Sequence, residues 1–304
     1  MNYDCAVKGE NISKKFKTFT LDIPDLRVPK GFATALIGEN GAGKTTLLNM
    51  LSGIRLDYKG ELTFFDKYSS EEKERRADVK NRIGYTGTGR YYLPQWTVSD
   101  VEEISSLLFD NFDRDEFERY CRELAIFPDS PDGVALKKKC SALSDGTRTK
   151  LMLAGVMARD TDLLLLDEPA SPLDPLMRDK LCQMIGDYIS DGAGEKSVLF
   201  STHNISDMES ITDYAIIMEH GNVVECGFVE DLKEKYILIK GDAQDAGAAS
   251  KILYTMTKNP YGFEGICLAE NLDKLAGMNV SKEIPSLFQI SVAVMKNNTK
   301  MVLK

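Results

Sequence analysis

Short apolar runs alternate along the first part of the chain with segments of helical composition. The runs cover residues 32–37, 163–166 and 197–200, and the first is followed by residues 45–51, which predict a helix. Continuous apolar runs of this length are typical of strands buried on both faces. Strands that alternate with helices favour a largely parallel sheet with crossover connections, so the pattern predicts an α/β fold.

Further elements are predicted around this core. Residues 1–35 and 60–66 have the pattern of strands, and residues 71–80 are expected to form a solvated, charged helical face. Residues 98–127 are expected to be helical, because four apolar side chains recur there at i, i+3, i+6 and i+7: Val101, Ile104, Leu107 and Leu108.

The pattern changes near residue 232. Residues 241–250 are small and polar, which is typical of a linker or of a loosely formed helix start. Residues 284–294 contain a short apolar segment that predicts a strand or a helix. We therefore expect residues 234–304 to form a small C-terminal appendage.

The overall composition narrows the possible functions. The 304 residues are 43% hydrophobic and 28% charged, which predicts a well-packed core, and the formal net charge is -9. Nucleic-acid-binding proteins usually carry a basic excess that neutralises phosphates, so we expect no nucleic acid partner. The six cysteines form no CxxC pair and have no histidine at metal-ligand spacing, so they are expected to be buried thiols in a reducing cytosol.

The sequence contains no segment suited to crossing a membrane. No stretch approaches the ~20 apolar residues that a membrane helix needs. The start of the chain (MNYDCAVKGE) lacks the basic and apolar regions of a signal peptide, so none is expected. If the protein serves a membrane, we expect another chain to supply the span.

A glycine-rich segment follows the first apolar run. Residues 38–45 (GENGAGKT) match the pattern G-x-x-x-x-G-K-[ST] between a predicted strand and a predicted helix. Glycines let the backbone turn tightly and bring N–H groups close to phosphate oxygens, and the helix N-terminus adds the positive end of its dipole. Lys44 would place its charge on the β- and γ-phosphates, and Thr45 would offer its hydroxyl to Mg²⁺. The predicted ATP-binding residues of this segment are Gly38, Glu39, Asn40, Gly41, Ala42, Gly43, Lys44, Thr45 and Thr46.

Two carboxylates end the second apolar run. Residues 163–166 (LLLL) are followed directly by Asp167 and Glu168. In open α/β sheets, ligands sit at the carboxyl ends of the strands. We therefore expect Asp167 to hold Mg²⁺, directly or through water, and Glu168 to orient and polarise the water that attacks ATP.

Residues 143–147 (LSDGT) lie between these two motifs, ahead of a helix predicted over residues 148–159. Here the chain resembles the ATP-binding subunits of ABC transporters, whose signature L-S-G-G-Q precedes the second acidic strand. Residues 171–174 (SPLD) are similar to the D-loop of that family, and residues 201–203 (STH) are similar to its switch histidine. The resemblance covers about residues 6–230, with the motifs in the family's order.

The resemblance implies a mechanism that needs two copies of the ATPase. Each ATP would be held in a head-to-tail dimer. The glycine-rich segment 38–45 of one copy, called the phosphate loop below, would hold it together with Ser144, Asp145 and Gly146 of the other copy. Glu168 and His203 would be the catalytic residues, with His203 bonded to the γ-phosphate. ATP would close the dimer, and hydrolysis would release it.

The resemblance also implies roles for residues outside the main motifs. Phe16 lies where the family usually stacks an aromatic ring on adenine, with Phe19 as a rival, and Asp174 is the acidic residue of the D-loop. Thr88 falls where the family has a glutamine that contacts the metal and the water, and Gln95 is the next glutamine along the chain. We favour Thr88 acting through a bridging water over Gln95, because Mg²⁺ ordinarily keeps several waters.

The signature departs from the family at Asp145 and Thr147, which replace a glycine and a glutamine. Ser144 and Gly146, the groups expected nearest to the phosphate, are retained. Asp145 adds a negative charge beside an anionic ligand. We therefore expect ATP to bind but the dimer to close less tightly.

The family also implies the overall fold and the partners. The expected fold is a P-loop NTPase of ABC type with a mostly parallel core sheet, an antiparallel β subdomain, a helical subdomain at about residues 90–160 and a small C-terminal appendage. The ATPase domain would span residues 1–233, and an accessory domain would span residues 234–304. The layout resembles export-type subunits, which implies an integral membrane transport subunit and a second copy or a homologous ATPase subunit as partners. The chain would be cytoplasmic, at the inner face of the cell membrane.

Other functions remain open from the sequence. One is a soluble ABC-type ATPase outside transport, such as an iron–sulfur assembly member. DNA-repair and translation-associated members are disfavoured, because the chain has neither long heptads nor a second phosphate loop. Another is an ATP-binding regulatory module that hydrolyses weakly, which Asp145 and Thr88 favour and the intact Glu168 and His203 disfavour. A small-molecule P-loop kinase would leave residues 143–147 without a role.

Overall fold

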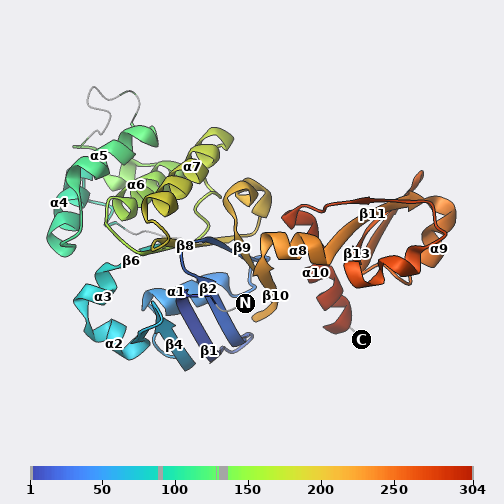
Figure 1. Ribbon diagram of the computed structural model, residues 1–304. Helices are drawn as coiled ribbons and strands as arrows, with labels where there is room; N and C mark the ends of the chain where they lie inside the picture. The colour runs from blue at the N-terminus through green and yellow to red at the C-terminus, as the bar shows by residue number, and fades with distance from the viewer. Residues whose placement is uncertain (1–2, 88–91, 128, 130–135, 303–304) are drawn as a thin grey trace.

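The computed structural model describes residues 3–87, 92–127, 129 and 136–302. The strands form three sheets, and Figure 1 shows the two N-terminal sheets on one side of the molecule and the C-terminal sheet on the other. Within these described ranges, no helix is both long enough and apolar enough to cross a membrane.

The largest sheet has six strands in the order β10-β9-β3-β8-β7-β6. Neighbouring strands are parallel except β10, which is antiparallel to β9. The three predicted apolar runs form its centre, where every residue of β3, β7 and β8 is buried. Its strands are β3 (Ala33–Ile37), β6 (Ile83–Thr86), β7 (Leu163–Leu166), β8 (Ser197–Thr202), β9 (Tyr214–Glu219) and β10 (Asn222–Phe228).

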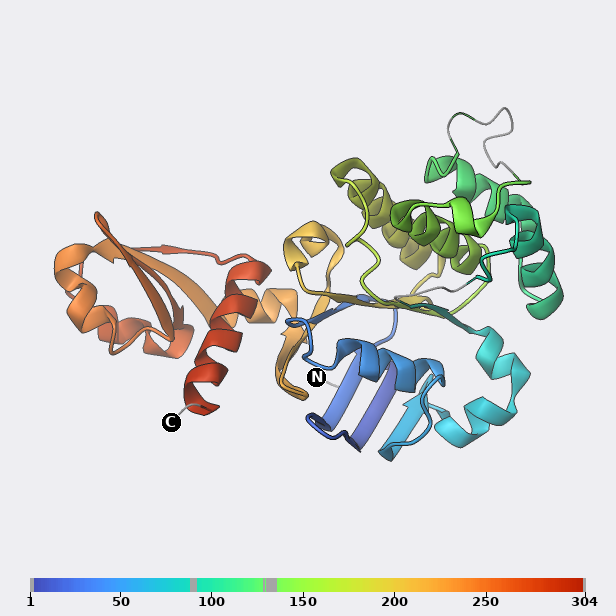
Figure 2. The same cartoon turned by 180° about the vertical axis from the view of Figure 1, so that it is seen from behind.

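An antiparallel sheet of order β2-β1-β4-β5 lies below this core sheet, with helix α1 between the two (Figures 1 and 2). Leu47 and Leu51 of α1 pack in one apolar cluster with Leu163 and Leu165 of the core sheet. The elements on this side are β1 (Cys5–Lys15), β2 (Thr20–Pro29), α1 (Lys44–Ser52), β4 (Lys59–Phe64), β5 (Tyr68–Ser69), α2 (Ser70–Arg75) and α3 (Ala77–Asn81).

Helices cover the opposite face of the core sheet. Leu164 and Leu166, which alternate with the two leucines that face α1, belong to the cluster formed with these helices, so β7 fills two cores. The elements on this side are α4 (Val98–Leu108), α5 (Arg114–Glu123), η1 (Cys140–Ala142), α6 (Asp145–Met157), α7 (Pro175–Asp191), η2 (Ile205–Asp207) and η3 (Glu209–Ile211).

Two segments predicted as single helices are each divided in the structure. Residues 98–127 form α4 and α5, because Phe109 has an extended backbone and Asp113 starts the next helix by accepting the Glu116 N–H at 3.0 Å. The charged segment 71–80 lies in α2 and α3, which are separated by the extended backbone of Arg76. In both segments the periodicity of the sequence continues across a residue with an extended backbone, at which the first helix ends.

The C-terminal sheet is antiparallel throughout, in the order β12-β13-β11-β14. Residues 241–250 are no linker: they end β11 and continue into two short helical turns. The apolar segment 284–294 lies mostly in α10, the red helix next to the C-terminus in Figure 2. The N–H of Leu287, the first residue of α10, donates to Glu209 Oε1 at 2.8 Å. The elements are α8 (Val229–Lys235), β11 (Tyr236–Asp242), η4 (Ala243–Asp245), α9 (Ala246–Ala249), β12 (Thr255–Asn259), β13 (Gly262–Leu268), η5 (Ala269–Leu275), β14 (Val280–Glu283) and α10 (Leu287–Val302).

Candidate active site

The glycine-rich loop joins the end of β3 to the start of α1. A Cβ atom on Gly38 would lie 2.5 Å from the Met218 carbonyl oxygen, so only glycine fits there. Gly43 precedes α1 with a φ of 109°, in the left-handed region that favours glycine. These two positions let the loop turn directly into the N-terminus of α1, where backbone N–H groups are available to an anion.

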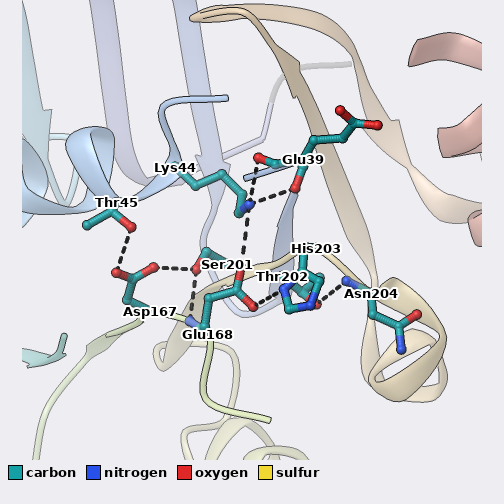
Figure 3. A network of polar contacts seen from close by, with 10 residues as sticks. Glu39, Lys44, Thr45, Asp167, Glu168, Ser201, Thr202, His203 and Asn204 are labelled. Atoms are coloured by element: carbon teal, nitrogen blue, oxygen red, sulfur yellow. Dashed lines mark hydrogen bonds and ion pairs between the residues drawn. The ribbon is translucent and has the colours of Figure 1, made fainter. Parts of the chain in front are cut away.

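Lys44 is 6% exposed and lies beneath this loop. Its Nζ donates to the carbonyl oxygens of Gly38 at 2.6 Å and Glu39 at 3.2 Å. The same nitrogen lies 3.4 Å from Glu168 Oε1 (Figure 3). The ammonium group therefore connects the loop to the acidic pair at the end of β7.

The acidic pair and His203 meet at the carboxyl edge of the core sheet (Figure 3). Asp167 is 4% exposed, and its Oδ2 accepts from the Thr45 hydroxyl at 2.8 Å. Glu168 Oε2 lies 2.8 Å from His203 Nδ1, so the two predicted catalytic side chains are in contact. The structure thus brings together Lys44, Thr45, Asp167, Glu168 and His203, which are contributed by three separate parts of the chain.

Ser201 is a member of this cluster that the sequence did not single out as a site residue. Its hydroxyl donates to Asp167 Oδ1 at 2.6 Å and accepts from the Glu168 N–H at 2.9 Å. The sequence did hold a sign of this role. Ser201 is a polar residue that directly follows the apolar run 197–200, as Asp167 directly follows the run 163–166. The carboxyl ends of parallel strands lie at the same edge of a sheet.

The two candidate aromatic residues lie next to each other. The ring centres of Phe16 and Phe19 are 5.8 Å apart, and the rings are tilted by 39°. Phe19 lines a cavity together with the phosphate loop and Glu168, whereas Phe16 lies against the Arg55 guanidinium, 5.2 Å from its ring centre. The ring nearer to the phosphate loop is therefore that of Phe19.

The signature residues Ser144, Asp145 and Gly146 form the start of α6. Ser144 caps this helix, since its hydroxyl accepts the N–H of the third helical residue at 3.1 Å. The Asp145 side chain is 88% exposed and pairs with the Arg148 guanidinium at 2.8 Å. Asp174 of the D-loop is also exposed and caps α7. These residues therefore present the N-termini of two helices.

A cavity of about 430 Å³ connects the signature to the acidic pair within one chain. Residues from the phosphate loop, the end of β6, the start of α6 and the end of β7 line it, among them Asn40, Thr86, Asp145, Arg148, Asp167, Glu168 and His203. Thr88 lies outside the described residues. Gln95 is exposed and lines neither this cavity nor the one beside Phe19.

Known proteins resemble this chain over most of its length. A family model described as ABC transporter matches residues 21–171. The energy-coupling factor transporter ATP-binding protein EcfA2 of Lactococcus lactis subsp. cremoris is 28% identical over 223 residues, which are 71% of this chain and 74% of that protein. The protein of the same name from Lactobacillus gasseri is 25% identical and covers 82% of this chain and 85% of its own length.

Solved structures share the fold. The structure of an ATP-binding subunit of an ABC transporter has a TM-score of 0.63 at 21% identity and covers 75% of this chain and 92% of its own. A dimeric bacterial ABC transporter cassette has a TM-score of 0.62 at 19% identity and covers 73% and 98%. A dimeric post-hydrolysis state bound to ADP and Pi has a TM-score of 0.60 at 20% identity, with the same coverage. The predicted ABC-type P-loop NTPase fold is confirmed.

Proposed function

Because this chain carries the ATPase domain of an ABC transporter ATP-binding subunit, we propose that it closes head to tail with a second copy around ATP and drives export through a separate membrane subunit. The observation that supports this function is the convergence of Lys44, Asp167, Glu168 and His203 at the carboxyl edge of the core sheet. Contacts of 3.4 Å or less link Lys44 to Glu168 and Glu168 to His203. Asp167, which precedes Glu168, pairs with the phosphate-loop residue Thr45.

The residues predicted to hold Mg²⁺ fit that ion. Thr45 Oγ1 and Asp167 Oδ2 are hard oxygen donors 2.8 Å apart. In the part of the chain that the structure describes, no group of three or more His, Cys, Asp or Glu could hold a metal. Mg²⁺ usually binds one or two protein oxygens together with substrate phosphates and waters, and Thr45 and Asp167 supply two such oxygens. When bound with ATP, the ion would neutralise charge on the β- and γ-phosphates.

Each remaining residue of the cluster has a separate task in the proposed reaction. Lys44 binds the β- and γ-phosphates through its charge. Glu168 accepts a hydrogen bond from the attacking water and polarises it. His203 orients the Glu168 carboxylate, which lies 2.8 Å away, and contacts the γ-phosphate in the closed dimer. The adjoining rings of Phe16 and Phe19 offer an apolar surface for adenine.

The second copy contributes Ser144, Asp145 and Gly146 to the γ-phosphate in this proposal. They form the N-terminus of α6, where N–H groups and the helix dipole favour an anion. The dimeric form of a solved ABC transporter cassette of the same fold supports a two-copy arrangement. We assign the ATPase unit to residues 1–233, its helical subdomain to about residues 90–160, and an accessory unit to residues 234–304.

Replacing Asp145 with glycine is expected to lower the KM for ATP by about two- to fivefold, because a carboxylate beside the phosphate is removed. The effect is small because Arg148 pairs with Asp145 and the carboxylate is exposed. Steady-state ATPase assays at low and high salt measure it, and high salt should reduce the difference. Asp115→Gly removes an acid from the first turn of α5 and is the matched control. Equal KM values in the two variants would contradict the proposed role of the signature.

Names of two relatives favour a second candidate, a subunit of a transporter of the energy-coupling factor type. An exporter and a transporter of the energy-coupling factor type should differ in how an inactive ATPase subunit changes the metabolite content of cells. If the chain drives export, cells that produce the Glu168→Gln subunit should accumulate the cargo, and untargeted metabolite analysis would detect this. Depletion of a metabolite with no accumulated one would support transport in the opposite direction.

An integral membrane protein is expected to co-purify with the tagged chain from detergent-solubilised native membranes. The proposed docking region includes Trp96 to Ile104, and near it Leu107 and Leu108 of α4 expose 75% and 67% of their surface. Replacing both leucines with glutamate should reduce recovery by roughly tenfold or more, since burying one leucine is worth about 1.5 kcal/mol or more. Ile284→Glu, at a residue 76% exposed in the C-terminal segment, is the control. Recovery of no integral membrane protein would favour a soluble ATPase.

A further inference from the structure

Ser201 lies near the carboxyl end of β8 and is completely buried. Figure 3 shows its hydroxyl between the two acidic residues, with 2.6 Å to Asp167 Oδ1 and 2.9 Å to the Glu168 backbone nitrogen. β8 pairs in parallel with β7, so the Ser201 hydroxyl lies beside Asp167 and Glu168, the two residues that follow β7. One side chain therefore contacts the predicted metal ligand and the predicted catalytic base.

The bond to Asp167 fixes the orientation of that carboxylate. Ser201 is the donor to Oδ1, and Thr45 is the donor to Oδ2 at 2.8 Å. A hydroxyl can donate one hydrogen bond and accept another at the same time. A methyl group can do neither, and a thiol does both only weakly. Loss of the Ser201 hydroxyl would leave Oδ1 without this donor, and the buried carboxylate could then turn about its side-chain torsions.

The bond to the backbone acts on Glu168. This residue has a φ of 50°, in the left-handed region that non-glycine residues rarely adopt. In this conformation its carboxylate oxygens lie 3.4 Å from Lys44 Nζ and 2.8 Å from His203 Nδ1. A disfavoured backbone conformation persists only where its surroundings fix it. The Ser201 hydroxyl, which accepts the Glu168 N–H, is one of the groups that do so.

We propose that Ser201 is a positioning residue for ATP hydrolysis, whose hydroxyl sets the direction of the Asp167 carboxylate and the backbone of Glu168 together. It acts through these two residues and touches neither the nucleotide nor the attacking water. The inference rests on the proposed function, because it assigns Ser201 to the same reaction. Partners of metal ligands of this kind typically affect metal affinity or activity by 10- to 100-fold.

Ser197 is a matched control on the same strand. It is completely buried at the opposite end of β8, and its hydroxyl also accepts a backbone N–H, from Gly31 at 2.9 Å. Replacing either serine with alanine removes a buried hydroxyl that accepts a backbone hydrogen bond. Only Ser201 contacts the acidic pair, so the two variants separate positioning from general stability.

The test measures ATP hydrolysis by purified Ser201→Ala, Ser201→Thr and Ser197→Ala, each with a thermal melt. Ser201→Ala is expected to lower kcat by about tenfold, to leave the KM for ATP within about threefold and to raise the half-saturating Mg²⁺ concentration by about threefold or more. Ser201→Thr retains the hydroxyl and should recover most of the lost kcat. Ser197→Ala should lower the melting temperature but keep kcat within about twofold.

A Ser201→Ala enzyme that melts like Ser197→Ala and keeps its kcat and Mg²⁺ dependence would overturn the inference. So would a Ser197→Ala enzyme with the same loss of kcat, or a folded Ser201→Thr enzyme with no recovery. These outcomes are distinct from failure of the proposed function. The proposed function would fail if the unchanged protein did not hydrolyse ATP, or if Lys44→Ala left its hydrolysis unchanged.

Discussion

Replacing Lys44 with alanine is expected to abolish ATP hydrolysis and to weaken nucleotide binding. The ammonium group is nearly buried, is held by the Gly38 and Glu39 carbonyl oxygens, and lies 3.4 Å from Glu168. Without it, the β- and γ-phosphates lose a positive charge in a site where little water can compensate. Steady-state ATPase assays and a titration with a fluorescent ATP analogue measure the two effects.

Lys73 provides a matched control for this variant. It is a second buried lysine, 2% exposed, and its Nζ donates to the Leu51 carbonyl oxygen at 2.9 Å, near the opposite end of α1. Burial lowers the pKa of Lys73, whose ion-pair partner is Glu74, outside the predicted site. Lys73→Ala should therefore lower the melting temperature and leave hydrolysis within about threefold. Normal turnover in Lys44→Ala, or its loss in both variants, would contradict the assignment of the phosphate loop.

The part of the fold that sequence patterns predicted best is the centre of the core sheet. Strands β3, β7 and β8 are buried on both faces, and each contains a short apolar run that differs clearly from the amphipathic segments around it. The site residues that follow these strands were predicted from different signals. Lys44 came from the glycine-rich motif after β3, Asp167 and Glu168 from the carboxylates that directly follow β7, and His203 from the resemblance to the ATP-binding subunits. Parallel strands end at one edge of the sheet, which is where these side chains meet.

The role of Ser201 depends on strand order, which the sequence does not state. β8 follows β7 in the chain, but only the structure shows that the two strands are neighbours and that Ser201 reaches both acidic residues. The sequence also could not predict which of Phe16 and Phe19 lies nearer to the phosphate loop. Both aromatic residues lie in one short turn, and their distance to the phosphate loop is decided by the path of that turn.

The C-terminal sheet was the least predictable part. Residues 241–250 are small and polar, so they suggested a linker or a loosely formed helix start. Their first two residues complete β11, and the residues that follow form the short helical turns η4 and α9. Gly241 is a glycine for a packing reason, because a Cβ atom at this position would lie 2.6 Å from the ring of Phe263 on the neighbouring strand. A glycine that permits close packing within a sheet and a glycine of a flexible linker look the same in a sequence.

Replacing Glu168 with glutamine is expected to lower turnover by about 10²-fold or more while ATP still binds. Glutamine keeps the length of the side chain, and the backbone N–H that donates to Ser201 is unchanged. The amide has no negative charge and cannot accept a proton from the attacking water, so the change removes the proposed base. Lys44 and the phosphate loop are untouched, so the nucleotide should remain bound. Multiple-turnover ATPase assays and direct binding titrations separate the two effects.

Glu219→Gln is the control for this change. Glu219 is also a buried carboxylate at the end of a core strand and has a histidine, His220, 3.7 Å away, and its Oε2 accepts a hydrogen bond from Asn298 of α10 at 2.7 Å. Its turnover should stay within about threefold of the unchanged enzyme.

The Glu168→Gln protein should also reveal the closed dimer. If ATP holds two copies together and hydrolysis releases them, a variant that binds ATP without hydrolysing it should elute as a dimer with ATP and Mg²⁺ and as a monomer with ADP. Gel filtration with light scattering measures both states. The unchanged enzyme should elute mainly as a monomer under the same conditions, because its ATP is consumed. A Glu168→Gln protein that stays monomeric with saturating ATP would contradict the head-to-tail dimer, whereas one that dimerises but turns over normally would contradict the role of Glu168 as the base.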